Sequence, residues 1–368
     1  MFYFGLDISK LRTGDVILVR GNGLVGWLVR KITKSKFAHA ELYAGQGMII
    51  ESTNPFAYSK NVQREVFRSR EHVIVRRSVE DPIDLELDAV VANARGLVGS
   101  RYSKLDAIAT VFKKSGAILK KIRDVAFYCF GGDMFCSRLV AEAYEEAGIQ
   151  IVANPSQCKP SDLAETDLLF TVNDCLHELS DEEQKIIRRK DMVGFQKLQF
   201  RFWFSIVRLV ASVCGYKIRT VNDVESFLIQ HRKLDSFVVG LIKITNYHKT
   251  YRRDLKINPE RYSAKALMDR VRDNIALIQF IRFEYSITHK NLLMRFQDLI
   301  AAVENYESFH LRYQKLNVDI LSGYIFQIGL SFKAFRDVLK LKGINDCVVQ
   351  MLEKDIDLID TSSVIITT

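Results

Sequence analysis

The stretch DMFCSRLVAEAY, from Asp133 to Tyr144, organises the first half of the chain. Its apolar side chains recur at the spacing of one helical face, at positions 139, 140, 143 and 144. Two glycines and Asp133 form a turn and a cap before this pattern, and Gly148 is a stop after it. We therefore predict an amphipathic helix with Cys136 in its first turn.

The position of Cys136 suits a nucleophile but does not establish one. The positive end of the helix macrodipole lowers the pKa of a thiol at a helix N-terminus, which favours the reactive thiolate. Buried cysteines nevertheless serve more often as small apolar residues. A catalytic role therefore requires a base for this thiol from elsewhere in the chain.

Length and composition describe a globular chain of two domains. The 368 residues exceed one typical domain, and 48% hydrophobic with 26% charged residues is ordinary for globular proteins. The formal net charge of +9 could favour nucleic acid, anionic lipid or an acidic polymer. The basic residues are scattered, without zinc-finger spacing or an RNA-binding aromatic signature, so we expect no specific nucleic-acid partner.

The six cysteines lie far apart and form no Cys-x-x-Cys pair: Cys129, Cys136, Cys158, Cys175, Cys214 and Cys347. This spacing argues against a zinc site and against a disulfide framework, so we predict no metal. Residues 1–10 lack the basic start and the apolar core of a secretory signal, which predicts a cytoplasmic chain.

The most apolar run extends from Phe202 to Cys214. Arg208 interrupts it, and it is too short to span a bilayer. We expect a core helix here and no transmembrane segment, with peripheral association with a membrane surface as the alternative.

The first half of the chain mixes strands and helices. Apolar and β-branched runs bounded by turns predict strands at 16–19, 37–45, 48–52 and 72–77. The second and third of these form a hairpin around Gly45-Gln46-Gly47. Helical periodicity predicts helices at 84–98 and 105–120, before the helix that carries Cys136.

From about residue 173 the pattern becomes helical. A capping box at Ser180–Glu183 opens the first helix, and helical periodicity recurs at 204–213, 224–247, 263–285, 291–313, 318–339 and 345–356. We predict an α+β domain at 1–172 followed by an all-α accessory domain at 173–368. The helical domain could present substrates, cover the cleft or bind a protein partner, and the sequence does not choose among these.

The predicted hairpin offers a base for Cys136. His39 lies in its first strand, and Glu51 is the lone charge after three apolar residues in its second. If the register lets them meet, Glu51 holds one imidazole nitrogen and the other nitrogen takes the thiol proton. A histidine in a strand is more often a core or edge residue, and Glu51 could face solvent. Spacing alone leaves both interpretations open.

Five short stretches have the order and spacing of one known family. They are a Gly-Asp strand (Thr13–Ile17), a histidine strand (Ala38–Tyr43), a segment with a polar third residue (Ile50–Ser52), a Gly-x-x-Tyr loop (Gly99–Tyr102) and an aromatic-Cys-Ser-x-Leu-Val helix (Phe135–Val140). Over about residues 13–165 the chain thus resembles the circularly permuted branch of the NlpC-type, papain-like cysteine hydrolases, typified by the YiiX group. The resemblance does not extend to the helical half.

The resemblance implies a papain-like domain in which Cys136 is the nucleophile, His39 the base and Glu51 the residue that orients the base. Backbone N–H groups at the start of the Cys136 helix would form the oxyanion hole, and Tyr102 would contact the substrate. The implied reaction is hydrolysis of an amide, isopeptide or ester bond through an acyl-cysteine intermediate, without a metal or organic cofactor. Peptide, cell-wall and lipid-linked substrates all fit.

Two other functions stay open at this point. A related branch of the superfamily transfers acyl groups from lipids with an Asn-Cys-Glu-His motif, whereas Ser137-Arg138 follows Cys136 here. Arg138 also differs from the smaller or acidic residue common in the YiiX group, which could alter substrate preference. The third function is that of a papain-like binding or scaffold protein without activity. The presence of Cys136, His39 and Glu51 together favours the enzyme.

Overall fold

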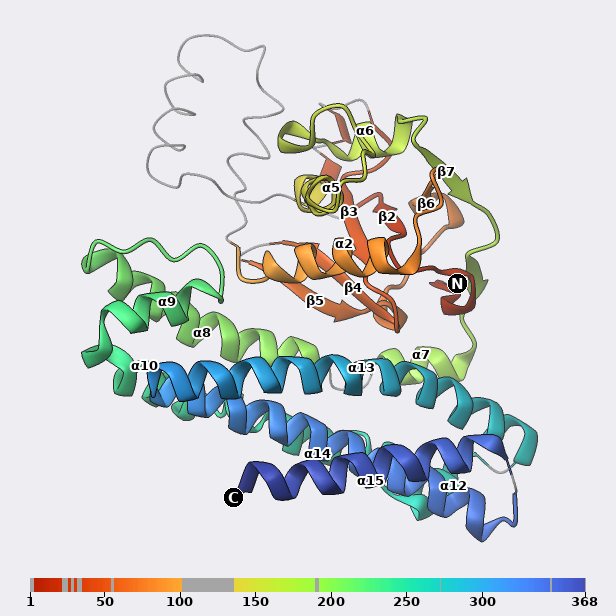
Figure 1. The fold of residues 1–368 in the computed structure, drawn as a ribbon. Helices are drawn as coiled ribbons and strands as arrows, with labels where there is room; N and C mark the ends of the chain where they lie inside the picture. Colours follow the sequence, from red (N-terminus) through yellow and green to blue (C-terminus); the bar gives the residue numbers. More distant parts are fainter. Residues whose placement is uncertain are drawn as a thin grey trace. The chain divides into compact units, whose positions relative to one another are not determined.

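The structure is a computed structural model that describes residues 3–21, 26–27, 30–31, 35–53, 56–100, 136–188, 192–271, 273–344 and 346–367. It divides into two compact units. The first, which we call the sheet unit, comprises Met1–Arg189 and Lys217–Asp223; the second, the helical unit, comprises Lys190–Tyr216 and Val224–Thr368. A region of mixed strands and helices is thus followed by a largely helical one (Figure 1).

The sheet unit is built on a six-stranded antiparallel sheet with the strand order β5-β4-β3-β2-β6-β7. Its strands are β2 (Val16–Val19), β3 (His39–Tyr43), β4 (Met48–Ser52), β5 (Ala57–Asn61), β6 (Val73–Ser78) and β7 (Leu169–Val172). The four strands predicted from the sequence are confirmed as β2, β3, β4 and β6. The prediction did not include β5 and β7, whose sequences mix polar with apolar residues.

The hairpin of β3 and β4 closes through a turn of left-handed residues. Gly45, Gln46 and Gly47 have φ values of +80°, +55° and +73°, a region that glycine enters without steric cost. The Met48 N–H donates to Gly45 O at 2.9 Å, and the Gly47 N–H donates to the Tyr43 hydroxyl at 3.0 Å. This turn fixes which residues of the two strands lie opposite each other.

Two helices cover one face of this sheet, α2 (Asp84–Gly96) and α5 (Cys136–Glu146) (Figure 1). Alternation along the strands points one set of apolar residues at these helices, and the buried core between them includes Val16, Leu18, Leu42, Ile50, Val90, Ala94, Leu139 and Tyr144. The helix predicted at 84–98 and the helix that carries Cys136 are confirmed. The helix predicted at 105–120 lies outside the described residues. The short α6 (Pro160–Glu165) completes this part of the unit.

The opposite face of the sheet has its own core, which includes Leu6, Ile17, Tyr43, Ile49, Val73, Val75 and Cys175. A two-stranded sheet of β1 (Phe4–Leu6) and β8 (Leu176–Glu178) contributes to it. The predicted boundary near residue 173 falls between β7 and β8, and the sheet unit continues through α7 (Asp181–Ile187). The division into functional domains at 1–172 and 173–368 stays a prediction.

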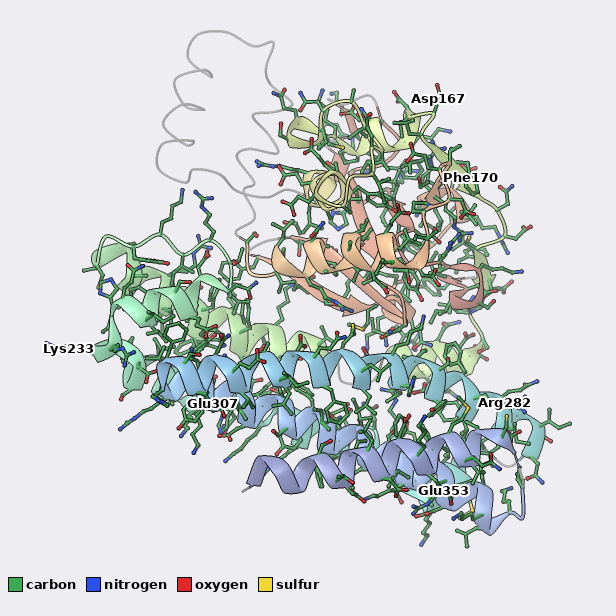
Figure 2. The ribbon with its side chains drawn as sticks, viewed as in Figure 1. Asp167, Phe170, Lys233, Arg282, Glu307 and Glu353 are labelled. Carbon is green, nitrogen blue, oxygen red and sulfur yellow. The ribbon has the colours of Figure 1, made fainter. Side chains whose placement is uncertain are left out.

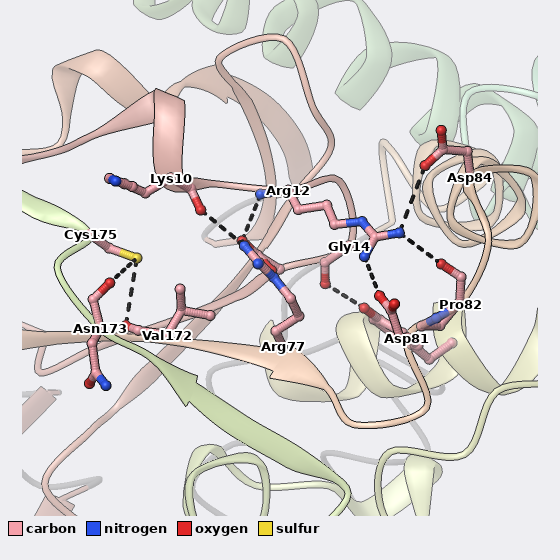
Figure 3. A network of polar contacts seen from close by, with 12 residues as sticks. Lys10, Arg12, Gly14, Arg77, Asp81, Pro82, Asp84, Val172, Asn173 and Cys175 are labelled. Atoms are coloured by element: carbon pink, nitrogen blue, oxygen red, sulfur yellow. Dashed lines mark hydrogen bonds and ion pairs between the residues drawn. The ribbon is translucent and has the colours of Figure 1, made fainter.

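A buried ion pair joins the start of β2 to β6. The Asp15 carboxylate is fully buried and accepts from Arg77 Nε at 2.7 Å and from Arg77 Nη2 at 2.8 Å. The Arg12 N–H donates to the same carboxylate, and the Arg12 guanidinium pairs with Asp81 on the surface (Figure 3). Burial nevertheless raises the pKa of Asp15. The Thr13-Gly14-Asp15 turn is therefore held by specific polar contacts as well as by packing.

The helical unit contains α8 (Met192–Val213), α9 (Asp223–Gln230), α10 (Asp235–Ile244), α11 (Thr250–Ile257), α12 (Ala264–Arg270), α13 (Asn274–Phe309), α14 (Arg312–Leu341) and α15 (Cys347–Thr367). The core formed by α12 to α15 includes Leu267, Leu277, Ile281, Phe332, Phe335, Leu352 and Ile356. Charged side chains such as Lys233, Arg282 and Glu307 project from the helices (Figure 2). The predicted helical character is confirmed for the residues of this unit that the structure describes.

The helix boundaries differ from those expected in several places: the segment at 224–247 contains two helices, α9 and α10, and α11 was not expected. The periodic segments at 263–285 and 291–313 suggested two helices, but the chain breaks earlier and then continues as the single helix α13. The Asp273 carboxylate caps α13 by accepting from the Ala276 N–H at 2.7 Å. Within the expected gap, the Ser286 and Thr288 hydroxyls donate to carbonyls of their own helix, so these polar residues do not interrupt it.

The apolar run at 202–214 lies in α8 except for Cys214, which follows the helix. Trp203, Phe204 and Val207 are buried, as expected for a core helix, while Phe202 and Leu209 are exposed. Across the described residues, no helix combines the length and apolar character needed to cross a bilayer.

Asp15→Asn is expected to destabilise the sheet unit by about 2 kcal/mol, because Arg77 would lose a buried, doubly hydrogen-bonded carboxylate. Hydrogen exchange of the β2 and β6 amides measures the free energy of opening these two strands, and this free energy should fall by that amount. The matched control is Asp81→Asn, which removes a carboxylate that is 73% exposed and should change the same value by less than about 0.5 kcal/mol. Equal effects of the two variants would contradict the role given to Asp15.

Candidate active site

The hairpin brings His39 and Glu51 into contact. Glu41 lies directly opposite Glu51 in the register, and alternation along β3 puts His39 on the same face as Glu41. His39 is therefore a diagonal neighbour of Glu51 across the two strands. His39 Nε2 donates to Glu51 Oε2 at 2.7 Å. The two residues that the sequence predicted to meet across the hairpin do so.

Cys136 is the first residue of α5, and its side chain is buried. Its sulfur is hydrogen-bonded to the His39 side chain and accepts from the backbone N–H groups of Ala40 and Ser137. The β3–β4 register ends at Glu41, one residue after Ala40. The Ser137 N–H lies in the first turn of α5, where helical N–H groups have no partner within the helix. The sulfur thus lies between the end of a strand ladder and the start of a helix.

The surroundings of Cys136 and His39 favour charge separation between them. Burial alone would raise the pKa of the Cys136 thiol, but the charge and hydrogen bond of His39 and the two backbone N–H groups lower this pKa below its ordinary value. Burial alone would lower the pKa of His39, but Cys136 and Glu51 raise it well above its ordinary value. Each group stabilises the charged form of the other, so the pair favours thiolate and imidazolium.

The Glu51 carboxylate is strongly held in its ionised form. Burial would raise its pKa, but the hydrogen bond and charge of His39, the charge of Lys60 and a hydrogen bond from Tyr58 lower the pKa well below its usual range. The Lys60 ammonium lies 3.1 Å from Glu51 Oε2. Since Nε2 of His39 is bound to Glu51, the other ring nitrogen, Nδ1, is left for the thiol.

A second carboxyl, Glu41, lies beside the same imidazole. Its Oε1 is 3.5 Å from His39 Nε2 and 2.8 Å from Lys60 Nζ. Together, His39, Glu41 and Glu51 offer ligand atoms within 4.8 Å of one another. The Lys60 ammonium contacts both carboxylates and supplies the positive charge there, so a divalent cation would have to displace it. We do not assign a metal to this group.

The structure brings together three of the four residues singled out from the sequence, Cys136, His39 and Glu51. Tyr102 lies outside the described residues, as do the residues just before Cys136. Sequence reasoning missed Tyr58 and Lys60, because it did not predict β5, and it did not use Glu41. The position of Glu41, two residues after His39 in an otherwise apolar strand, was the signal that could have found it.

The remaining cysteines have different surroundings. Burial raises the pKa of the Cys158 thiol and raises that of Cys175 to about 11. Cys214 and Cys347 are exposed, and Cys129 lies outside the described residues. Arg138 is the residue that differs from the smaller or acidic one common in the YiiX group. Its Nε donates to Glu142 Oε1 at 2.6 Å along α5. Among the described cysteines, Cys136 is the one hydrogen-bonded to a histidine.

The fold has distant counterparts among solved structures. No protein-family model and no curated protein matches the chain. The chain is similar to a crystal structure titled metalloprotein yiiX from Escherichia coli O157:H7, with 16% sequence identity and a TM-score of 0.27. The similarity covers 44% of this chain and 97% of that chain.

Iodoacetamide should alkylate Cys136 faster than the other cysteines, because its lowered pKa keeps it a thiolate at pH values where ordinary thiols are protonated. At about pH 6 we expect a rate at least about tenfold above that of the exposed Cys214 and Cys347. Peptide mass mapping measures each rate. His39→Ala should remove the advantage, and equal, slow labelling of all cysteines would contradict the geometry described.

Proposed function

We propose that the chain is a cysteine hydrolase that cleaves an amide, isopeptide or ester bond through an acyl-cysteine intermediate. The observation that carries this proposal is the His39 imidazole, hydrogen-bonded on one side to the Cys136 sulfur and on the other to the Glu51 carboxylate. A nucleophile, a base and a group that orients the base are the parts that nucleophilic catalysis requires.

The first half of the reaction forms the acyl-enzyme. The Cys136 thiolate attacks the carbonyl carbon, and the carbonyl oxygen takes up the negative charge. Backbone N–H groups in the first turn of α5 stabilise that oxyanion. When the tetrahedral intermediate collapses, the His39 imidazolium gives its proton to the leaving nitrogen or oxygen, and a thioester remains on Cys136.

The second half releases the acid. Neutral His39 takes a proton from water, and the resulting hydroxide attacks the thioester carbonyl. Collapse of the second tetrahedral intermediate expels the Cys136 thiolate, and His39 keeps the proton. Glu51 holds the ring in one orientation throughout and stabilises the imidazolium each time it forms. These steps use residues of this chain and water only.

The proposal includes the fold family and the division of labour along the chain. We propose that residues 1–172 form a papain-like domain of the permuted NlpC type, with a helical accessory domain at 173–368 that engages the substrate or a protein partner. The order of β3, β4 and α5 supports the first part, because the histidine strand precedes the cysteine helix. Peptide, cell-wall and lipid-linked substrates are the classes to test.

An activated ester such as p-nitrophenyl acetate tests the proposal directly. We expect the wild-type chain to release nitrophenol and to carry an acetyl group on Cys136 in the intact mass. Cys136→Ala should abolish both signals, and His39→Ala should lower turnover by about 10²-fold or more. Cys214→Ala, at an exposed cysteine, is the matched control and should behave as wild type.

Two outcomes would overturn the proposal. Wild-type turnover in Cys136→Ala would exclude this thiol as the nucleophile. Turnover only with a lipid acyl donor and an acceptor other than water would assign the site to acyl transfer instead of hydrolysis.

A further inference from the structure

A second buried carboxyl beside His39 has no part in the proposed reaction. The Glu41 side chain is 1% exposed, and Oε1 lies 3.5 Å from His39 Nε2. Its register partner on β4 is Glu51, so two carboxyls lie side by side in the interior of the sheet unit. Carboxyl oxygens of the two residues lie within 4.8 Å of each other. Two negative charges this close do not both persist in a buried setting without a cation between them.

Lys60 on β5 supplies that cation. Its Nζ lies 2.8 Å from Glu41 Oε1, 3.1 Å from Glu51 Oε2 and 2.7 Å from Glu65 Oε1. The Lys60 side chain is 18% exposed, so the ammonium is largely withdrawn from water. It contacts the same Glu51 oxygen that receives the His39 hydrogen bond. The ammonium and the imidazole therefore share one carboxylate.

The two carboxyls are not equivalent. Glu51 receives hydrogen bonds from His39 and Tyr58 besides its contact with Lys60. Glu41 is bound by Lys60 at Oε1, and its Oε2 has no hydrogen-bond partner in the described part of the chain. Burial raises the pKa of Glu41 to about 8, while that of Glu51 is lowered. Burial thus favours the neutral form of Glu41, whereas the contacts of Glu51 favour its ionised form.

We propose that Lys60 is a positioning residue for the reaction, whose ammonium keeps Glu51 ionised against His39 while Glu41 anchors the ammonium. This inference rests on the proposed function. Lys60 acts through Glu51 and does not touch the thiol in the described contacts. Six other charged or titratable groups lie around the Lys60 ammonium and its carboxyls. They are His39 and Glu41 on β3, Glu51 on β4, Tyr58 on β5, Cys136 on α5, and Glu65, which follows a short 3₁₀ turn.

Removing the ammonium has a definite consequence for Cys136. The net charge around His39 and Glu51 would become one unit more negative, and a more negative surrounding favours the protonated forms of neighbouring groups. The Cys136 thiolate would then form at a higher pH. A purely structural role for Lys60 would lower the amount of folded protein without moving that pH.

The experiment is the pH dependence of Cys136 alkylation by iodoacetamide in the full chain, followed by peptide mass mapping. In Lys60→Met we expect the pH at which half the thiolate forms to rise by about one unit, which slows alkylation about tenfold below that pH. Lys60→Arg keeps a positive charge and should restore most of the wild-type profile. Lys333→Met removes a surface partner of Asp360 and should give the wild-type profile.

Lys60→Gln is the second variant if Lys60→Met does not fold, because it removes the ammonium but keeps a polar side chain beside the carboxyls, and it should raise the same pH. Glu41→Gln tests the anchoring role of Glu41, because it removes the second carboxyl. Because burial raises the pKa of Glu41, its ionisation should add a second inflection to the wild-type profile, and Glu41→Gln should lack this inflection.

The failure of this inference is distinguishable from the failure of the proposed function. If Cys136 is selectively alkylated in the wild type and His39→Ala abolishes this, but Lys60→Met and Glu41→Gln both follow the wild-type profile, the role of Lys60 is wrong and the hydrolase proposal stands. If Cys136 shows no selective alkylation in the wild type, the proposed function fails first.

Discussion

The site depends on one imidazole held between two anionic groups in the interior of the sheet unit. Burial opposes a charge on His39, yet its contacts with Cys136 and Glu51 outweigh that opposition and raise its pKa. The imidazolium beside Cys136 and two backbone N–H groups favour the thiolate, and Glu51 stabilises the imidazolium from its other side. Loss of His39 would leave the Cys136 thiolate and the Glu51 carboxylate without the cation that lies between them.

The fold provides this arrangement with local devices. The tight turn after Tyr43 sets the β3–β4 register, and the register puts Glu51 within reach of His39. The buried apolar face of α5 packs on the same sheet, which brings the first residue of the helix to the start of β3. The Lys60 ammonium then balances the carboxylates behind the histidine. Packing and charge balance therefore act on the same few residues.

Much of this was predictable from the sequence because the signals were local. The turn at 45–47, the alternating strands and the helical spacing after Cys136 predicted the elements that carry the site. The contribution of β5 was not predictable in the same way, since Ala57–Asn61 is mostly polar and is a strand because it pairs with β4. Lys60 and Tyr58 could be found only once that pairing was known. The prediction divided α13 wrongly, because the polar residues Ser286 and Thr288 donate hydrogen bonds to carbonyls of their own helix and do not interrupt it.

The most direct measurement of the central claim is the titration of His39 followed by NMR in histidine-labelled protein, with His39→Ala to assign its signal. The account predicts that His39 stays protonated well above the ordinary pKa of histidine and that Cys136→Ala lowers its pKa, because the thiolate stabilises the imidazolium. A His39 signal that titrates at the ordinary value and does not change in Cys136→Ala would contradict the account.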